Sequence, residues 1–163
     1  MNNQMRILQG LKLAAVLAVA LSMGACAKNL GNEAMASAAV PGSQQDFVVN
    51  VGDRVFFETD SSELTSAAQA TLSKQAAWLT RYGNYSFTIE GHADERGTRE
   101  YNFALGARRS QAAHDFLVSK GIAASRMRTV SYGKERPVAT CDDISCWSQN
   151  RRAVTVLSGA PGS

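Results

Sequence analysis

Short alternating and β-branched runs along the chain predict the strands of a small sheet. The run YSFTIE at Tyr85–Glu90 alternates apolar and polar side chains, so every second residue is expected to face a buried side. Two later runs rich in β-branched residues, Met127–Tyr132 and Ala153–Leu157, predict two more strands. Earlier in the chain, Phe47–Val51 and Arg54–Phe57 predict either two small strands or one bent strand.

Two longer segments carry apolar residues at helical spacing and predict helices. The first starts at a cap formed by Thr65 or Ser66 and runs to about Arg81, and Gly83 is expected to end it in a left-handed conformation. The second spans about residues 100–120 and ends at the next glycine. Strands that alternate with two helices predict an α/β sandwich, with the helices packed on one face of the sheet.

The first 25 residues are typical of a bacterial secretory signal. Met1–Lys12 is polar with two cations and no acid, and Leu13–Leu21 is an apolar run that leads to small residues. This run is shorter than the ~20 apolar residues that a membrane-spanning helix needs. We therefore assign residues 1–25 to a signal peptide.

The signal ends in LSMGAC, which resembles the lipobox of bacterial lipoproteins. In that motif the signal is removed before a cysteine that carries lipid, here Cys26, which we expect to hold acyl chains such as palmitate. Met23 departs from the usual leucine, and an ordinary cleavage site with a chance cysteine is the alternative. Ala27 is not the aspartate that retains lipoproteins at the inner membrane, so the outer membrane is implied.

A flexible tether is predicted between the lipid anchor and the folded domain. Residues 27–46 are rich in Ala, Gly, Ser, Asn and Gln and sustain no apolar period. As a coil, this segment spans roughly 25 Å. The predicted organisation is therefore a lipidated cysteine and tether over 26–46, a folded domain over 47–158 and a short tail over 159–163.

The charge balance argues against a nucleic-acid partner. Formal net charge is +3, but Arg6 and Lys12 lie in the acid-free leader, which leaves 15 basic against 14 acidic residues in the rest of the chain. Nucleic-acid binding proteins usually carry a basic stripe. A nearly neutral domain without such a stripe has a different partner.

Two cysteines outside the leader predict a disulfide. Cys141 and Cys146 lie in a stretch, residues 133–148, that is expected to be irregular. A secretory signal implies an oxidising compartment, in which such a pair closes a short loop. A single Cys-x4-Cys pair without a second pair is not a zinc module, so no metal site is expected.

The candidate binding site lies in the charged stretch Gly91–Arg109. An acid such as Asp94 and an arginine such as Arg109 form the minimal receptor for a zwitterion, because arginine donates two parallel hydrogen bonds to a carboxylate and aspartate accepts from an ammonium. A solvated loop with weak surface ion pairs is the alternative. Their separation of fifteen residues does not establish that the two side chains meet.

Several motifs in a fixed order make this chain similar to the OmpA-like C-terminal domain family. The resemblance extends from about Val55 to Leu157, and the lipobox and tether match the lipid-anchored members of the family. The motifs are VFFETD (Val55–Asp60), IEGHADERGTREYN (Ile89–Asn102), LGARR (Leu105–Arg109), VSYGKERP (Val130–Pro137) and NRRAV (Asn150–Val154).

The resemblance implies a βαβα-type sandwich with a small mixed sheet and a non-enzymatic function. Members of the family bind peptidoglycan non-covalently at the diaminopimelate of the stem peptide, whose free amino acid group is a zwitterion. The resemblance further implies a lipid-anchored protein on the periplasmic face of the outer membrane. Its implied partners are TolB and other Tol–Pal components, with roles in envelope integrity and cell division.

The resemblance also implies roles for individual residues. Asp94 would take the ammonium, Arg109 would take the carboxylate, and Asp60 would be a further acid of the pocket. These roles predict that Asp94→Ala and Arg109→Ala lose wall binding without unfolding. Thr59 and Arg96 are further candidate contacts, and Ala93 and Leu105 are expected to shape the site through backbone and packing. His92 is expected to be structural, and Asn150 and Arg151 receive no assigned contact.

Two other classes of function stay open. A wall hydrolase would need an activated nucleophile, a carboxylate pair or a metal, and the chain has only two histidines, His92 and His114, and neither a G-x-S-x-G nor an HExxH motif. A protein-interaction module with a vestigial wall site is the second alternative. No cofactor is expected for the wall-binding function, whereas a hydrolase could use a metal for which His92, Asp94 and His114 are conceivable ligands.

Overall fold

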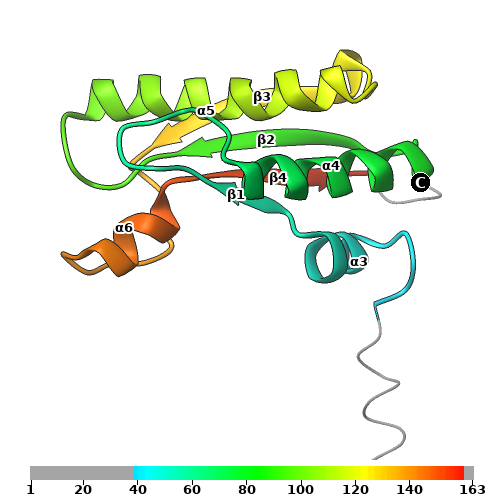
Figure 1. Ribbon diagram of the computed structural model, residues 1–163, viewed down its shortest axis with the longest axis horizontal. Helices are drawn as coiled ribbons and strands as arrows, with labels where there is room; N and C mark the ends of the chain where they lie inside the picture. The colour runs from blue at the N-terminus through cyan, green and yellow to red at the C-terminus, as the bar shows by residue number, and fades with distance from the viewer. Residues whose placement is uncertain (1–38, 160–163) are drawn as a thin grey trace, which may run out of the picture. The chain divides into compact units, whose positions relative to one another are not determined.

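A four-stranded mixed sheet forms the centre of residues 39–159, the part of the chain that this computed structural model describes (Figure 1). Its strands lie in the order β1-β4-β2-β3. β2 and β3 are parallel, and β4 is antiparallel to β1 and β2. The expected small mixed sheet is confirmed. The strands are β1 (Arg54–Phe56), β2 (Ser86–His92), β3 (Met127–Gly133) and β4 (Arg152–Ser158).

Two long helices, α4 (Ser66–Arg81) and α5 (Arg99–Ser119), pack on one face of this sheet, as predicted. Thr65 caps α4 by accepting a hydrogen bond from the Ala68 backbone, and Thr98 caps α5 in the same way. The shared core joins strand and helix residues, among them Val55, Leu72, Leu79, Phe87, Ile89, Ala113, Leu117 and Met127. Burial of alternate residues on β2 confirms the predicted alternating strand.

The two long helices end in different ways at their C-termini. Gly121 follows α5 with φ +90°, so the glycine that was predicted to stop this helix does so in a left-handed conformation. The corresponding prediction for Gly83 is wrong, because the helix ends at Tyr82 with φ −113° and Gly83 does not have a positive φ. The Tyr82 backbone closes the last turn by donating to the Trp78 carbonyl, so no left-handed residue is needed there.

The segment before β1 is helical rather than extended, which corrects the prediction of a strand at Phe47–Val51. It forms a short α3 (Gln44–Asp46) that runs into the π-helix η1 (Phe47–Val51). Tertiary contacts outweigh the β-branched composition here, because Phe47 is fully buried and its ring lies 4.9 Å from that of Trp78. The indole also donates to the Asp46 carboxylate at 2.8 Å.

Ordered structure therefore starts earlier than the expected boundary at residue 47. The Tyr85 hydroxyl donates to the Gly42 carbonyl at 2.8 Å and ties this turn to the core. The predicted signal, Cys26 and residues 26–38 of the tether lie outside the described residues, as do residues 160–163 of the tail. No helix within residues 39–159 has an apolar stretch long enough to cross a membrane.

A further helix, α6 (Ile144–Asn150), begins within residues 133–148, the stretch that was expected to be irregular, which corrects that prediction. Asp143 caps it by accepting from the Ser145 backbone at 2.6 Å, and hydrogen bonds from the Ser145 side chain and then from its backbone lower the pKa of Asp143. The disulfide between Cys141 and Cys146 is present and joins its first turn to the preceding loop. Seven residues carry too little apolar periodicity to be recognised as a helix from sequence.

Two glycines let α5 lie directly against the sheet. A Cβ on Gly91 of β2 would overlap the Gly106 carbonyl of α5, and one on Gly106 would overlap the Ser131 hydroxyl of β3. Ser131 also donates to the Phe103 carbonyl at 2.6 Å, so α5 is hydrogen-bonded to the strand it approaches. This close contact brings the start of α5 next to the end of β2.

We expect Gly91→Ala to lower the free energy of unfolding by about 1–3 kcal/mol or more, because the overlap is with backbone and cannot be relieved by a side-chain rotation. Gly83→Ala is the matched control, since nothing lies within 4 Å of its added Cβ. Its effect is expected to stay within ~1 kcal/mol. Urea unfolding of both variants makes the comparison, and equal stabilities would contradict the close-packing argument.

Candidate binding site

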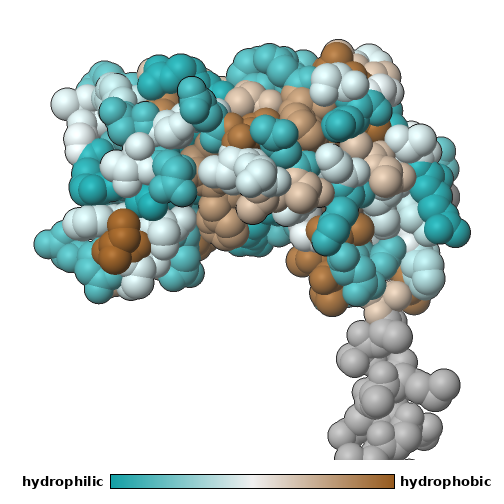
Figure 2. Space-filling model, in the orientation of Figure 1, coloured by the Kyte–Doolittle hydropathy of each residue, from teal (hydrophilic) through white to brown (hydrophobic). Residues whose placement is uncertain are grey.

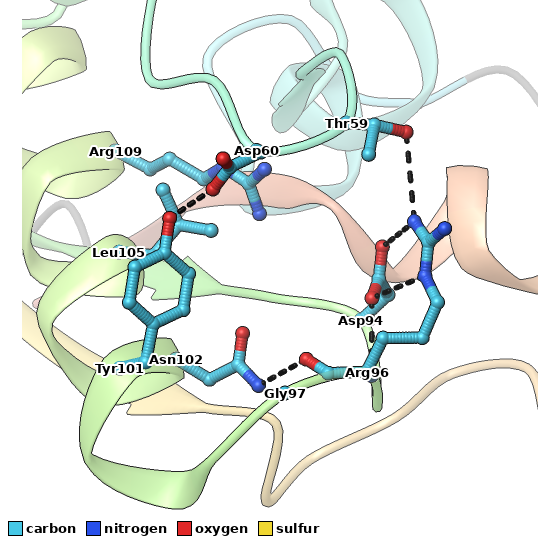
Figure 3. Close-up of a pocket in the computed structure, with 9 residues that line it drawn as sticks. All are labelled: Thr59, Asp60, Asp94, Arg96, Gly97, Tyr101, Asn102, Leu105 and Arg109. Carbon is cyan, nitrogen blue, oxygen red and sulfur yellow. Dashed lines mark hydrogen bonds and ion pairs between the residues drawn. The ribbon is translucent and has the colours of Figure 1, made fainter.

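A cleft of about 440 Å³ lies where the end of β2, the loop after β1 and the first half of α5 meet. It is lined by two acids, two arginines and several uncharged groups (Figure 3). Six of the seven predicted site residues are brought together in it, although their contact with a ligand stays a prediction. The described lining residues are Thr59, Asp60, Asp94, Arg96, Gly97, Tyr101, Asn102, Leu105 and Arg109.

Ala93 is the predicted site residue that does not line the cleft. Its side chain is buried, and its backbone N–H donates to the Gly133 carbonyl at 2.8 Å. Ala93 therefore joins the ends of β2 and β3 and sets the direction in which the chain enters the loop that carries Asp94.

One face of α5 supplies much of the cleft wall. Tyr101, Leu105 and Arg109 follow one another at intervals of four residues, which places them on the same side of a helix. Sequence reasoning missed Tyr101 and Asn102, although this spacing was a usable signal for Tyr101. Asn102 is buried and donates to the Arg96 carbonyl at 2.7 Å, so it holds the loop in place.

Arg109 is fully buried and is held by three backbone carbonyls. Its Nε donates to Ser61 at 2.8 Å, Nη1 to His92 at 2.8 Å, and Nη2 to Glu58 at 3.1 Å. Burial, followed by the nearby charge of Arg151, lowers the pKa of Arg109 to about 10, so the side chain is still a cation at neutral pH. Among the described residues, these bonds use three of its five N–H groups.

Asp94 already has cationic partners in this structure. The Arg96 guanidinium donates to both of its carboxylate oxygens, at 3.1 and 2.7 Å, and Arg151 Nη1 lies 3.4 Å from Oδ2. Burial would raise the pKa of Asp94, but the hydrogen bonds and charge of Arg96, with help from Arg151, lower it below the ordinary value. The carboxylate is therefore held in its charged form.

Asp60 lies near Arg109, on the side of the cleft away from Arg96 (Figure 3). It has φ +57°, which makes it the one non-glycine residue within 39–159 in the left-handed region. Its carboxylate accepts a hydrogen bond from the Tyr101 hydroxyl. Figure 3 shows each acid of the cleft beside an arginine, so positive and negative charge alternate around the opening.

Arg151 and Asn150, which received no assigned contact from sequence, hold Asp94 and the neighbouring loops in position. The buried Arg151 donates to the Phe57 carbonyl at 2.9 Å as well as to Asp94, so it links the loop after β1 to the acid. The buried Asn150 accepts from the backbone of Val138 and Ala139 and orders the loop before α6. The NRRAV motif was the available signal for both.

The His92 side chain lies away from the cleft, which agrees with its expected structural role. It is 2% exposed, its ring packs near Tyr132 on the other face of the sheet, and its carbonyl is the group that accepts from Arg109. Burial, and then the charges of Arg152, Arg136 and Arg54, lower the pKa of His92 to about 4. Among the described residues, neither ring nitrogen has a hydrogen-bond partner.

A comparison with protein families gives a match over residues 56–151 to the family described as the OmpA family. A peptidoglycan-associated lipoprotein of Rhizobium meliloti (strain 1021) is 66% identical over 153 residues, covering 91% of this chain and 87% of the relative. The match thus extends well beyond the folded domain.

Solved structures give the same picture for the fold. The crystal structure of the peptidoglycan-associated lipoprotein from Burkholderia pseudomallei has a TM-score of 0.63 at 40% identity, covering 65% of this chain and 90% of that one. The C-terminal domain of Helicobacter pylori MotB has a TM-score of 0.62 at 19% identity, covering 66% and 85%. The second likeness shows a shared fold only.

Acid is expected to destabilise the domain through His92. Since the folded protein keeps this ring neutral to about pH 4 while the unfolded chain protonates it near pH 6.5, the unfolded state binds more protons between these values. Stability is thus lost as pH falls from 6.5 to 4, by at most about 3 kcal/mol. Asp94, whose pKa is lowered, contributes only below that window.

The measurement is urea unfolding of the wild type and His92→Phe at pH 7.5 and pH 4.5. Phe keeps an aromatic ring beside Tyr132 and does not titrate. The variant is expected to lose less stability than the wild type on acidification. Parallel losses in the two proteins would show that His92 is not the acid-sensitive group.

Proposed function

The chain belongs to the OmpA family, in its group of peptidoglycan-associated lipoproteins, and from this premise we propose that it is an outer-membrane lipoprotein that binds peptidoglycan without covalent attachment. The ligand is the diaminopimelate of the stem peptide. The observation that carries this proposal is the buried, cationic Arg109 in the same cleft as the charged Asp94.

The two charged groups of a free amino acid fit the two kinds of charge in the cleft. Arg109 retains, among its described contacts, one N–H on each terminal nitrogen, and these can donate side by side to a carboxylate. The ammonium goes to Asp94, Asp60 lies across the cleft beside Arg109, and the methylenes of the ligand lie against Leu105. A low-dielectric cleft strengthens both ionic contacts.

Binding at Asp94 involves an exchange of partners. The carboxylate already accepts four hydrogen bonds, three from Arg96 and one from Arg151. An incoming ammonium takes the place of the Arg96 side chain, which is the more exposed of the two arginines. A ligand with a carboxylate then offers the released guanidinium a new partner, which favours a zwitterion over a simple amine.

The anchor and the assembly partners complete the proposed role. Cys26 holds the chain on the periplasmic face of the outer membrane, and the domain ties that membrane to the cell wall. TolB and other Tol–Pal components are the proposed protein partners, in envelope integrity and cell division. The strong similarity along the length of the Rhizobium meliloti relative supports the group of lipoproteins to which the chain belongs, and the partners are proposed from that membership.

The protonation state of Asp94 fits a site that binds its ligand without cleaving it. Hydrolysis by a carboxylate pair needs one acid that is protonated near neutral pH. Asp94 does not meet this need, because its partners lower its pKa. The His92 ring lies on the other face of the sheet, so it does not supply a general base to the cleft.

Asp94→Asn is expected to weaken binding of a diaminopimelate-containing stem peptide by tenfold or more, because a charged hydrogen bond contributes about 1.5–3 kcal/mol. Arg109→Lys is expected to do the same, since lysine keeps the charge but not the two parallel donors. Arg109→Ala is a poor test of binding, because it removes the donor to three backbone carbonyls and destabilises the fold. The earlier expectation that Arg109→Ala loses binding without unfolding is revised accordingly.

Calorimetric titration of the full-length chain in detergent, with a lysine-containing peptide for comparison, measures these effects. Asp115→Asn is the matched control, since this exposed carboxylate lies on α5 outside the cleft. Wild-type affinity in both Asp94→Asn and Arg109→Lys would overturn the site assignment. Absence of heat with either peptide for the wild type would favour a protein-interaction module.

A further inference from the structure

We propose that α6 is a positioning element of the wall-binding site: Trp147 holds Arg96 in place, and the Cys141–Cys146 disulfide keeps α6 where Trp147 can do so. This inference rests on the proposed function, because it concerns the affinity of the same cleft. It assigns a role to a helix and a disulfide that otherwise have none in binding.

Trp147 contacts the site loop at two neighbouring residues. The Arg96 guanidinium carbon lies 4.2 Å from the centre of the indole, within the range of a cation–π contact. The indole Nε1 donates to Glu95 Oε1 at 3.0 Å. One side chain of α6 therefore fixes both residues that follow Asp94, and the loop cannot shift without breaking one of these contacts.

Arg96 is the residue through which Trp147 can affect binding. In the free protein its guanidinium lies between the indole and Asp94, and Nη2 is also 3.5 Å from the Thr59 hydroxyl (Figure 3). When a ligand ammonium takes its place on Asp94, stacking on Trp147 keeps the guanidinium at the edge of the cleft. There it can meet the ligand's carboxylate without first being ordered, which lowers the entropic cost of binding.

The second connection from α6 runs through the residues at its end. Arg151, which directly follows the helix, donates to Asp94, and Asn150 orders the preceding loop. A change in the position of α6 therefore reaches Asp94 by two routes, one through Arg96 and one through the backbone. Arg151 is buried and anchored on Phe57, so the route through Trp147 is the more easily altered of the two.

The disulfide is the feature that keeps this short helix folded and in place. Isolated helices of fewer than about 12 residues are marginal in water, and α6 has seven. Its first turn is held by the Asp143 cap and the bond from Cys146 to the exposed Cys141. Reduction by a dithiol breaks this S–S bond, forms two thiols with two electrons and two protons from the reagent, and leaves the dithiol as its own disulfide.

Figure 1 shows α6 beside the ends of the strands, outside the layer formed by the sheet and the two long helices. Figure 2 shows it as a projection from the described surface, separated by a hollow from the lobe that contains α3. Loosening its first turn therefore leaves the main core in place. Reduction of the disulfide is therefore expected to weaken peptide binding while the domain stays folded.

The test is a double-mutant cycle on the full-length chain in detergent, with a diaminopimelate-containing stem peptide as the probe. Trp147→Ala is expected to weaken binding by about three- to thirtyfold, the range of a cation–π contact. Trp147→Phe keeps a ring under Arg96 and is expected to retain most of the affinity. In an Arg96→Ala background, Trp147→Ala is expected to have a clearly smaller effect, because only the hydrogen bond to Glu95 is still there to lose.

Reduction with dithiothreitol, or the Cys141→Ser/Cys146→Ser variant, is expected to lower affinity by a similar factor and to leave the circular dichroism spectrum unchanged. In Trp147→Ala the reductant is expected to have little further effect. Equal affinity of the oxidised and reduced protein would overturn the role of the disulfide. An equal loss on Trp147→Ala with and without Arg96 would overturn the role of Trp147 as a positioning residue.

A ligand-free measurement separates this inference from the proposed function. Indole fluorescence is expected to shift to longer wavelength in Arg96→Ala and on reduction, because Trp147 loses the guanidinium that covers it, while Trp78 stays buried. If the wild type binds no peptide but the emission shifts, the proposed function is wrong and the contact is real. An unchanged emission in both cases would refute the contact itself.

Discussion

Both the fold and the site depend on the hydrogen bonds that the buried guanidinium of Arg109 donates. This side chain extends from α5 and donates to the carbonyls of Glu58 and Ser61 in the loop after β1, and to the carbonyl of His92 at the end of β2. Burying a cation is costly unless it is well satisfied, and three backbone carbonyls supply that satisfaction. The same residue therefore joins three separate segments and forms part of the wall of the cleft.

Close packing makes this arrangement possible. Gly91 and Gly106 allow the axis of α5 to lie against β2, so the arginine near the middle of the helix reaches the end of the strand. With larger residues at these positions, the helix would stand off the sheet and the guanidinium would lose its carbonyl partners. The glycines thus serve the site indirectly, through the distance between two elements.

The free site is already neutralised by its own residues. Asp94 is paired with Arg96 and Arg151, and Asp60 accepts from Tyr101. Such a site exchanges internal partners for ligand partners on binding, so its net affinity reflects the difference between two sets of similar contacts.

The sequence by itself determined the strands at Tyr85–Glu90 and 127–132, both long helices, the disulfide and six of the nine residues that line the cleft. These features follow from local periodicity, capping residues and motif order, which are properties of neighbouring positions. The π-helix at Phe47–Val51 and the helix α6 were decided only by the tertiary structure, because the packing of Phe47 against Trp78 and the hydrogen bond from Trp147 to Glu95 join distant parts of the chain. The partners of Asp94 and Arg109 were decided in the same way: a charged residue in a sequence does not show which carbonyl or carboxylate folding brings within 3 Å of it.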